Sequence, residues 1–442
     1  MNKQELIACL SNSNYNCIIL DEALYNPIEI IILTDVKKKL SAWVAANNCF
    51  TIDDNGKKRI LNILSFSEVG SKQFFNLWKS HATKISDNVF ALSDSDTDIF
   101  LLLYVYTYAE RNHWLRQNII TILMQKRKLS DETDLITLLT SYLNKYHISL
   151  SIHRLVDLPK PLIQQLSLIN KSAYYFTYIL LKIKRRFILE ILKCINILHK
   201  AKSPNVFLQY LQKQGFPREQ LSVLSMSNGS TGSVFLKQEC TDGTYFIKGN
   251  ELSIYNGLSN EIDAQELLRK NNQNPRWYLP MTEADCKKNW VKYPFVEWST
   301  LNTFLDTNIC LTREQLKTLG QDLLLFLDEL QSHNITHNDL KPNNIMVTTS
   351  HSSQIEHFIL TDFGCSCKNN MFPWPSHNLW GKYFARNLCG NYRYNETIVD
   401  DAASAYLVYI NAGGALDDEM AHQIKTRIGT NYLITYEARK KG

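Results

Sequence analysis

The sequence lacks any apolar run long enough to cross a bilayer. Its longest apolar runs, residues 99–108 and 173–181, are about half the roughly 20 residues that a membrane-spanning helix needs. The first 16 residues contain no apolar stretch of the kind that marks a secretory signal. We therefore expect a soluble, cytoplasmic protein. Export into a host cell by a specialised system would leave no trace that these rules detect.

Cysteine pairs with metal-binding spacing are also missing. The ten cysteines are scattered, and only Cys365 and Cys367 lie close together in the sequence. This pattern favours reduced thiols in a reducing compartment over a disulfide framework or a zinc site. The sequence also has no large excess of charge of one sign. The net charge is +5, and no basic stripe is interleaved with aromatic residues, which argues against a nucleic-acid partner.

Glycine is absent from residues 71–214, which favours helices over turn-rich structure. Residues 131–146, for example, place apolar side chains at spacings of three and four. A chain of 442 residues also exceeds one typical core. We predict a mainly α-helical domain of unknown role at 1–215. The stretch 201–220, which contains two prolines and a glycine, would join it to a second domain at 216–442.

The helical half contains one basic segment beside apolar residues, LLKIKRRFILEILK at 180–193. Such a segment can make peripheral contact with an anionic membrane or bind an acidic partner. The interpretation that the sequence alone favours is simpler: a core helix with a solvated basic edge. The helical half as a whole could also recruit a regulatory partner or a substrate.

After residue 220 the pattern becomes β-rich, and its first turn is rich in glycine. Ser227-x-Gly229-x-x-Gly232-x-Val234 has the spacing of a phosphate-binding loop between two strands, with serine in the first glycine position. Glycine lets backbone amides approach phosphates without a Cβ clash. Val234 would then lie over a bound adenine. Taken alone the pattern is weak, because Gly/Ser turns join many hairpins.

Lys248 stands at the end of the third strand of this region, 16 residues after Gly232. A strand lysine in this position can pair with nucleotide phosphates, provided that a carboxylate holds it in place. The following helix offers Glu261 and Glu266. We prefer Glu261, since it precedes the apolar residues of the helix and can share their inward face. Glu266 remains the alternative.

The stretch THNDLKPNNIMV, residues 336–347, places four polar side chains beside a buried strand. Asp339 can accept the proton of a hydroxyl nucleophile, and Lys341 can neutralise charge on a transferring phosphoryl group. Asn344 can bind a metal ion through its amide oxygen. His337 would be a structural prop that hydrogen-bonds the backbone near a metal-binding loop. The alternative is an ordinary polar loop with a capping aspartate and a surface lysine.

Asp362 follows the apolar run 358–360 and precedes Phe363 and Gly364. A carboxylate at a strand end can chelate Mg²⁺ that bridges nucleotide phosphates, because hard cations prefer oxygen ligands. Glycine loop, strand lysine, helix glutamate, acidic loop and Asp-Phe-Gly arrive in this order at sensible intervals. One nucleotide-binding fold explains all of them more simply than separate coincidences do.

With these motifs, residues 220–410 resemble the eukaryotic-type protein kinase superfamily. The resemblance implies a bilobal α+β domain with an N-lobe at 216–293 and a C-lobe at 297–442. It implies ATP and Mg²⁺ as cofactors, with Asn344 and Asp362 as the metal ligands. It also implies transfer of the γ-phosphoryl group to a protein substrate.

The resemblance assigns roles outside the motifs as well. Tyr293 is expected near the gatekeeper position. Residues 294–296 are expected to form the hinge between the lobes, so that the backbone of Phe295 and Val296 holds adenine. Asp401 is expected to brace the catalytic loop from a buried helix under the active site.

The sequence departs from the family in several places. Asn338 replaces the arginine that usually receives an activation-loop phosphate, which puts control by loop phosphorylation in question. No Ala-Pro-Glu motif is present, and only about thirty residues follow Ile410, too few for all the late helices of the large lobe. We expect a reduced C-lobe or help from residues 1–215. Compact kinases of this kind occur among bacterial effectors.

Three functions are open on the sequence alone. The first is a Ser/Thr protein kinase, since Asp-Leu-Lys-Pro-Asn favours serine and threonine hydroxyls as acceptors. The second is a small-molecule or glycan kinase on the same fold, although such relatives often lack the Lys-Pro and Phe-Gly found here. The third is a helical scaffold that carries a vestigial kinase, which the complete set of catalytic groups disfavours.

Overall fold

The computed structural model describes most of the chain, and every structural statement below refers to that part. The described residues are 2–20, 29–47, 51–54, 57–65, 69, 73–108, 113–148, 150, 160–164, 166, 171–172, 174–176, 179–180, 183, 186–187, 204–226, 233–249, 257–271, 276–285, 287, 289–297, 299–307, 311–349, 355–368, 388–394 and 398–434. Three residues of the predicted phosphate-binding loop, Ser227, Gly229 and Gly232, lie outside them, as does most of the basic segment at 180–193.

Residues 17–91 carry a six-stranded sheet, so the prediction of a mainly α-helical N-terminal domain is wrong for this region. The strand order is β3-β4-β2-β1-β6-β5. β2 runs parallel to β4 and β1 runs parallel to β6, while the other neighbours are antiparallel. The strands are β1 (Cys17–Leu20), β2 (Glu29–Thr34), β3 (Thr51–Asp54), β4 (Lys57–Ser65), β5 (Thr83–Ser86) and β6 (Val89–Ala91).

The sheet escaped prediction because its central strands are buried on both faces. Every residue of β1 and β2 is buried. Ile18 and Ile31 pack into the core on one face, whereas Ile19 and Ile32 pack into the core on the other. A strand of this kind shows no alternation of apolar and polar residues, so its periodicity cannot be told from that of a short buried helix.

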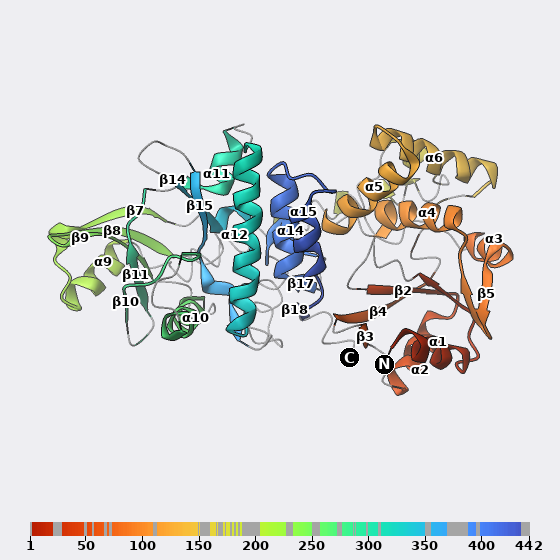
Figure 1. The fold of residues 1–442 in the computed structure, drawn as a ribbon, viewed down its shortest axis with the longest axis horizontal. Coiled ribbons are helices and arrows are strands. Elements are labelled where there is room, and N and C mark those ends of the chain that lie inside the picture. The colour runs from red at the N-terminus through yellow and green to blue at the C-terminus, as the bar shows by residue number, and fades with distance from the viewer. Residues whose placement is uncertain are drawn as a thin grey trace.

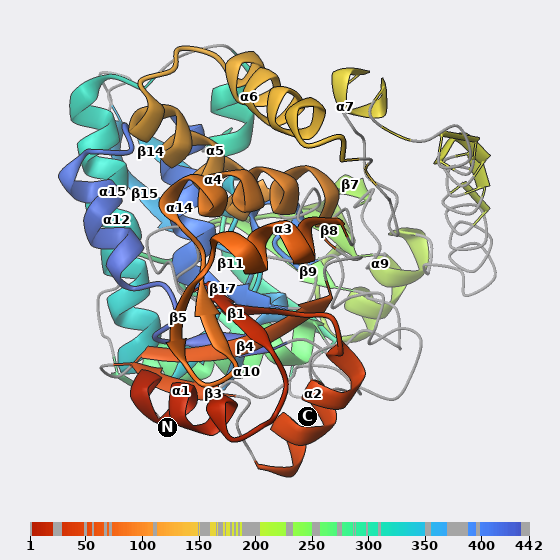
Figure 2. The same cartoon turned by 90° about the vertical axis from the view of Figure 1, so that its right-hand side faces the viewer.

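Helices cover both faces of this sheet, as Figure 2 shows. α1 (Lys3–Ser11) and α2 (Lys37–Ala46) lie on one face, and α3 (Gln73–His81) lies on the other. Helices follow further along the chain: α4 (Asp94–Leu103), a π-helical turn (Tyr104–Tyr108), α5 (His113–Arg127), α6 (Glu132–Lys145) and the short α7 (Lys160–Gln164). Of these, α6 is the helix expected from residues 131–146. In the described part of the chain, no helix has the length and apolarity needed to cross a bilayer.

The predicted β-rich region after residue 220 is a five-stranded sheet with the order β10-β11-β9-β8-β7. Its strands are β7 (Leu221–Met226), β8 (Val234–Cys240), β9 (Gly243–Gly249), β10 (Glu283–Ala284) and β11 (Trp290–Pro294), and a 3₁₀ turn (Arg218–Gln220) precedes them. α10 (Gly257–Asn271) packs on one face through Leu258 and Ile262, which join Val291 and Tyr293 in a small core. This sheet and α10 form the N-lobe.

The other face of the N-lobe sheet is covered by α9 (Pro204–Lys213), within the stretch expected to be a junction. Phe207, Leu208 and Leu211 of α9 share a core with the strands. The approach is so close that a Cβ on Gly249 would clash with the Phe207 ring. Glycine at this position is therefore a packing requirement. α9 thus packs on the N-lobe sheet although it precedes the predicted boundary at 215.

The C-lobe is mainly helical and is built around α12 (Arg313–Ser332), which starts with a capping box between Thr312 and Gln315. Backbone pairing links it to the N-lobe, since the Leu360 amide donates to the Trp277 carbonyl at 2.8 Å. The remaining elements are β12 (Ser299–Thr300), α11 (Leu301–Asp306), β13 (Ile335–Thr336), β14 (Ile345–Thr349), β15 (Ile355–Leu360), β16 (Cys367–Lys368), β17 (Ile398–Asp400), α14 (Asp401–Asn411), α15 (Glu419–Thr426) and β18 (Tyr432–Ile434), with 3₁₀ turns at Pro342–Asn344, Phe363–Cys365 and Gly390–Tyr392.

The C-lobe shares one hydrophobic core with the N-terminal half of the chain. Figure 1 shows α14 and α15 between α12 and the helices α4 to α6. Leu123 of α5 and Tyr406 of α14 belong to the same buried cluster. Across this joint, Lys425 Nζ of α15 donates to Asn118 Oδ1 of α5 at 2.9 Å. Residues of the N-terminal half therefore pack directly against the C-lobe.

Candidate active site

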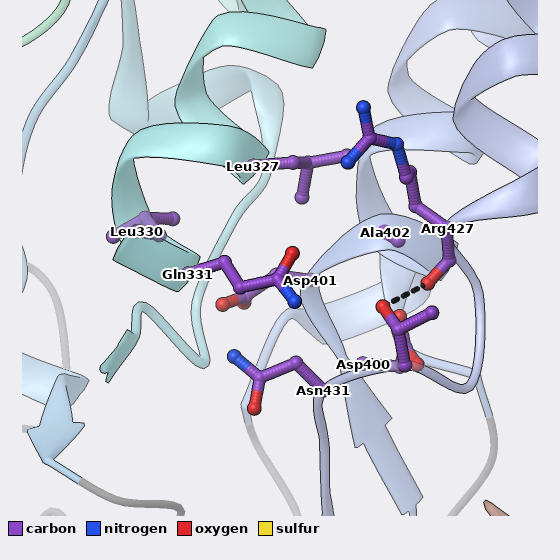
Figure 3. Close-up of a pocket in the computed structure, with 9 residues that line it drawn as sticks. Leu327, Leu330, Gln331, Asp400, Asp401, Ala402, Arg427 and Asn431 are labelled. Carbon is purple, nitrogen blue, oxygen red and sulfur yellow. Dashed lines mark hydrogen bonds between the residues drawn. The ribbon is translucent and has the colours of Figure 1, made fainter. Parts of the chain in front are cut away.

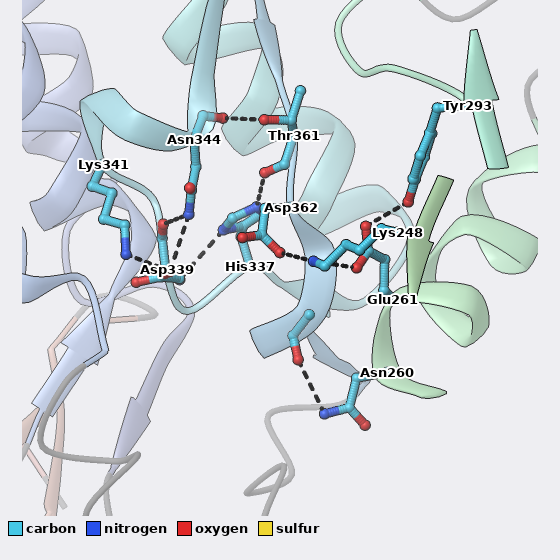
Figure 4. A network of polar contacts seen from close by, with 11 residues as sticks. Lys248, Asn260, Glu261, Tyr293, His337, Asp339, Lys341, Asn344, Thr361 and Asp362 are labelled. Carbon is cyan, nitrogen blue, oxygen red and sulfur yellow. Dashed lines mark hydrogen bonds and ion pairs between the residues drawn. The ribbon is translucent and has the colours of Figure 1, made fainter. Parts of the chain in front are cut away.

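The two lobes meet at Lys248, the penultimate residue of β9. Its Nζ lies 2.7 Å from Glu261 Oε2 on α10 and 2.8 Å from Asp362 Oδ1 in the C-lobe (Figure 4). Glu261 is buried, whereas Glu266 is exposed on the same helix. The structure therefore settles the pairing that the sequence left open, because Glu261 is the carboxylate that contacts Lys248.

Tyr293 on β11 holds the second oxygen of the same carboxylate. Its hydroxyl donates to Glu261 Oε1 at 2.5 Å. Burial raises the pKa of Tyr293 well above its usual range, and the charge of Glu261 adds to this effect, so the phenol keeps its proton. Burial also raises the pKa of Glu261, although Lys248 opposes that shift. The chain Tyr293–Glu261–Lys248 thus fixes the lysine against the sheet.

Asp339 lies in the loop between β13 and the turn at 342–344, and three groups hold its carboxylate. Lys341 Nζ is 2.7 Å from Oδ2, and Asn344 Nδ2 donates to the same oxygen at 3.0 Å. The backbone amide of Cys389 donates to Oδ1 at 2.7 Å. Burial raises the pKa of Asp339, and Lys341 opposes the shift. A fixed carboxylate with a raised pKa is suited to accept a proton from a neighbouring hydroxyl.

Asp401, the first residue of α14, braces this loop from below. Its Oδ2 accepts the His337 amide at 2.7 Å, and its Oδ1 accepts the Asn338 amide at 2.9 Å. His337 is buried, and burial lowers its pKa, so its ring is neutral. Nε2 lies 3.0 Å from the Thr361 carbonyl, and Nδ1 lies 3.3 Å from the Asp339 amide. The ring therefore carries its proton on Nε2 and ties the loop to the end of β15.

Asn338 takes the place of the family's arginine and is engaged within the loop. Its backbone is left-handed, with φ of 63°. Its Nδ2 donates to the Cys365 carbonyl at 3.1 Å and to Thr336 Oγ1 at 3.1 Å, and it lies 3.2 Å from Cys367 Sγ. A neutral amide therefore links the catalytic loop to the segment after Asp362, where an arginine would present a charge.

Asp362 lies between the lobes in a left-handed conformation, with φ of 62° and ψ of 68°. Its side chain is 46% exposed. Burial alone would raise its pKa, but the charge and hydrogen bond of Lys248, together with the charge of Lys341, outweigh that effect and lower the pKa to about 2. The neighbouring Phe363 ring is fully buried and packs edge-on against His337 at 5.0 Å between ring centres. Asp362 is therefore anchored as a carboxylate.

The oxygens of Asn344 and Asp362 fit the donor set for a magnesium ion. Within the described part of the chain, neither Asn344 Oδ1 nor Asp362 Oδ2 has a hydrogen-bond partner, while the other terminal atom of each side chain is engaged. No group of three or more His, Cys, Asp or Glu side chains among the described residues could hold a metal ion by itself. Mg²⁺ typically takes one or two protein ligands and completes its shell with water and phosphate oxygens.

Val234 does not lie where the sequence predicted. It pairs with Gly249, whereas Lys248 pairs with Phe235. Since directly paired residues share a face and consecutive residues alternate, Val234 points away from Lys248. It is fully buried in the core beneath α9. The predicted contact of Val234 with adenine is therefore wrong in this structure, because the register of the β8–β9 hairpin turns it to the opposite face.

Two aromatic residues occupy the Lys248 face instead. Phe235 and Phe246 stack with ring centres 5.4 Å apart, and Phe246 lies 6.4 Å from the Tyr293 ring. Strand alternation places Phe246, two residues before Lys248, on this face, so the sequence held a signal for it. The contact of the Cys389 amide with Asp339 spans 50 residues, and no sequence signal indicated it.

The predicted hinge follows β11 directly. The Phe295 amide donates to the Thr244 carbonyl at 2.9 Å, so this amide is already engaged with the β8–β9 hairpin. Lys237 Nζ lies 5.1 Å from the centre of the Phe295 ring. Phe295 and Val296 are both half-buried. Among the described residues, no partner accepts a hydrogen bond from the Val296 amide.

A pocket lies beside Asp401, the residue that braces the catalytic loop (Figure 3). It lies where α12 meets the start of α14 and the turn before β18. Asp400 caps α14 by accepting the Ala403 amide at 2.9 Å, and its second oxygen accepts the Gly429 amide at 2.8 Å. The lining residues are Leu327, Leu330, Gln331, Asp400, Asp401, Ala402, Arg427, Thr430 and Asn431.

Comparison with protein families gives a match between residues 228–399 and the protein kinase domain. The serine/threonine-protein kinase cek1 of Schizosaccharomyces pombe is 27% identical over 148 residues, which are 32% of this chain and 10% of that protein. The probable serine/threonine protein kinase IREH1 of Arabidopsis thaliana is 27% identical over 164 residues, which are 34% of this chain and 12% of that protein.

A probable serine/threonine-protein kinase of Dictyostelium discoideum is 29% identical over 118 residues, 27% of this chain and 25% of that protein. The chain thus spans between 10% and 25% of the length of these three relatives. Among solved structures, a crystal structure of the Rad53 kinase domain and SCD2 in complex with AMPPNP is similar, with 16% identity and a TM-score of 0.28. That similarity covers 47% of this chain and 72% of that one.

Proposed function

We propose that the protein kinase domain of this chain, residues 228–399, transfers the γ-phosphoryl group of ATP to serine or threonine hydroxyls of protein substrates. One observation carries the proposal. Lys248 of the N-lobe contacts both Glu261 and Asp362, so the group expected to bind phosphates and the group expected to bind metal meet across the lobes. The curated relatives are described as serine/threonine kinases, and this supports the choice of acceptor.

Nucleotide binding is assigned to the junction of the lobes. Lys248, held by Glu261, would neutralise charge on the α- and β-phosphates. The Val296 amide, which has no hydrogen-bond partner among the described residues, would donate to adenine, whereas the Phe295 amide is already bonded to Thr244. Phe246 would offer its ring to the base on the Lys248 face. The loop residues expected to close over the phosphates lie outside the described residues.

Metal binding is assigned to Asn344 and Asp362, because Asn344 Oδ1 and Asp362 Oδ2 have no hydrogen-bond partner among the described residues. A bound Mg²⁺ would neutralise charge that develops on the phosphate oxygens during transfer. Asp362 contributes a carboxylate whose pKa is lowered to about 2, so it is ionised at any physiological pH. Asn344 is held by Asp339 on its amide nitrogen side, which orients its oxygen outward.

Asp339 is assigned to the acceptor hydroxyl. Its carboxylate is held by Lys341 and by the Cys389 amide, so it would orient the hydroxyl and receive its proton as the new bond forms. Lys341 would stabilise negative charge on the phosphoryl group during its transfer. Burial raises the pKa of Asp339 and so makes it the stronger base.

Activity of this site would not require a phosphate on the activation loop. Asn338 carries no charge to receive one, and its amide already bonds the Cys365 carbonyl. Neutral hydrogen bonds from Asn338 thus link the catalytic loop to the segment after Asp362. The same proposal leaves room for the N-terminal half to recruit substrates or partners. The effector role suggested by the compact large lobe stays a prediction.

The test is transfer of labelled phosphate from Mg·ATP by the purified full chain, with protein, sugar and lipid acceptors in parallel. We expect label on serine and threonine of protein acceptors. Asp339→Asn and Asp362→Asn should each lose about 10²- to 10⁴-fold in rate. Glu261→Gln should lose activity while Glu266→Gln, exposed on the same helix, should keep it. Label on sugar or lipid alone, or full activity of Asp362→Asn, would refute the proposal.

A further inference from the structure

α10, the helix that carries Glu261, contacts the cores of both lobes. Ile262 packs in the small core of the N-lobe with residues of β11, whereas Leu268 is buried in the large core that the C-lobe also lines. Two buried polar side chains, Glu261 and Gln265, lie four positions apart and therefore on the same side of the helix. Glu261 contacts Lys248, whereas Gln265 bonds a different part of the N-lobe.

The side-chain amide of Gln265 makes two hydrogen bonds to the backbone of one short segment, residues 279–281, just before β10. Its Nε2 donates to the Leu279 carbonyl at 3.1 Å, and its Oε1 accepts the Met281 amide at 3.1 Å. Gln265 is only 2% exposed, so the loss of either bond would leave a buried polar group without a partner, which is costly. The two bonds therefore fix the position of α10 relative to this segment.

The same segment pairs with the strand that delivers Asp362. The Leu279 amide donates to the Leu360 carbonyl at 3.4 Å, at the end of β15. A second bond joins the first turn of α10 to the chain beyond Asp362, because Asn260 Nδ2 donates to the Gly364 carbonyl at 3.3 Å (Figure 4). α10 is thus tied to the backbone before and after Asp362, through the Leu279 segment and directly through Asn260.

We propose that Gln265 is a positioning residue that holds α10 where Glu261 contacts Lys248, and we call its two hydrogen bonds the Gln265 lock. A helix that moved away from the sheet would have to break both bonds of the lock together with the Glu261–Lys248 pair. The pair is therefore assembled by the chain itself, without a loop phosphate or a partner that presses on α10. This inference rests on the proposed kinase function and adds how its N-lobe half is controlled.

The first test does not depend on phosphate transfer. Gln265→Met keeps the length of the side chain and removes both hydrogen bonds, and amide hydrogen exchange of the purified full chain is compared with that of the wild type. We expect α10 and the Met281 amide to exchange at least about ten-fold faster in the variant, while α12 keeps the wild-type rate. Gln209→Met is the matched control, because Gln209 is exposed on α9. Unchanged exchange of α10 in Gln265→Met would overturn the proposal.

The second test measures whether the lock serves the site. In titration calorimetry the dissociation constant for Mg·ATP should rise about five-fold in Gln265→Met, because Glu261 no longer holds Lys248 in one place. The Michaelis constant for a protein acceptor, which meets Asp339 in the other lobe, should change by less than about two-fold. Gln209→Met should match the wild type in both. Faster exchange of α10 with an unchanged affinity for Mg·ATP would make Gln265 a purely structural residue and overturn the proposal.

The outcomes for the wild type separate this inference from the proposed function. A wild type that binds Mg·ATP but labels no protein acceptor refutes the proposed function, and the lock stands if exchange and affinity change in Gln265→Met as expected. A wild type that labels protein acceptors, with a Gln265→Met variant of equal affinity and rate, refutes the lock and leaves the proposed function in place. A wild type that binds no Mg·ATP overturns both.

Discussion

Among the residues that have no proposed catalytic role, Tyr293 should affect the site around Lys248 the most. Its hydroxyl is buried and bonded to the carboxylate that holds Lys248. A hydrogen bond to a charged group contributes about 1.5–3 kcal/mol, and leaving a buried carboxylate oxygen unpaired is costly. Tyr293 is therefore a positioning residue for the Lys248–Glu261 pair, in addition to any role beside the nucleotide.

Tyr293→Phe removes this hydrogen bond while keeping the ring. We expect Glu261 to hold Lys248 less firmly, so the dissociation constant for Mg·ATP should rise and the rate should fall by about ten-fold. Titration calorimetry and steady-state kinetics measure the two effects. Tyr245→Phe is the control, because the Tyr245 hydroxyl bonds Asp242 on the exposed hairpin. An unchanged nucleotide affinity in Tyr293→Phe would show that Glu261 needs no such support.

The polar side chains of the site were largely predictable from sequence, because their spacing is local. Asp339, Lys341 and Asn344 lie within six positions, and the loop geometry alone brings them together. The position of Val234 was predicted wrongly because the face to which it points depends on the register of the β8–β9 hairpin. A register shift of one residue turns every side chain of a strand to the other face. Contacts made by backbone amides, such as that of Cys389, leave no mark on side-chain identity.

At the level of elements, α9 is the helix on the N-lobe sheet that the sequence patterns did not predict. Proline and glycine at its two ends gave the stretch the look of a junction. In the structure Phe207 packs against Gly249, so a helix from outside the predicted kinase domain closes the back of its sheet. The long helices with clear periodicity, α6 and α12, were by contrast within reach of sequence patterns.

Phe207→Ala leaves a cavity between α9 and the sheet. We expect a loss of about 3–5 kcal/mol in the free energy of unfolding, measured by denaturant titration. Val206→Ala, on the exposed side of the same helix, should change it by less than about 0.5 kcal/mol. Gly249→Ala should also destabilise, and in combination with Phe207→Ala it should cost less than the two changes summed. Strict additivity would contradict the contact.

For the molecule as a whole, the joint between α5 and α15 contains a partly buried cation. Burial lowers the pKa of Lys425 to about 8, below the usual lysine value of about 10.4. Below pH 8 the ammonium is charged in both the folded and the unfolded chain, and its burial cost is fully present. Between about pH 8 and pH 10 the unfolded chain binds more protons, so stability should rise with pH at this site.

Comparison with Lys425→Met isolates this effect from other groups that titrate in the same range. We expect the unfolding temperature of the wild type, relative to that of the variant, to increase as the pH rises from 7 to about 10. Lys317→Met, on the exposed side of α12, controls for the loss of one positive charge. A difference between wild type and Lys425→Met that stays flat or moves the other way would contradict the burial of this cation.

The arrangement of the two lobes followed from the family resemblance, but the joint with the N-terminal half did not. Asn118 and Lys425 are 307 positions apart, and neither residue belongs to a motif. Contacts at such separation are set by which apolar faces remain uncovered once each part has folded. A single sequence does not record that matching.

Because α5 and α14 share one core, the proposed kinase domain depends on the N-terminal half of the chain for part of its packing. A shortened chain that began at Pro204 would keep every catalytic group and lose the helices that shield Tyr406 and its neighbours. Replacing the N-terminal half by another domain would therefore require a new covering surface for these buried residues of α14.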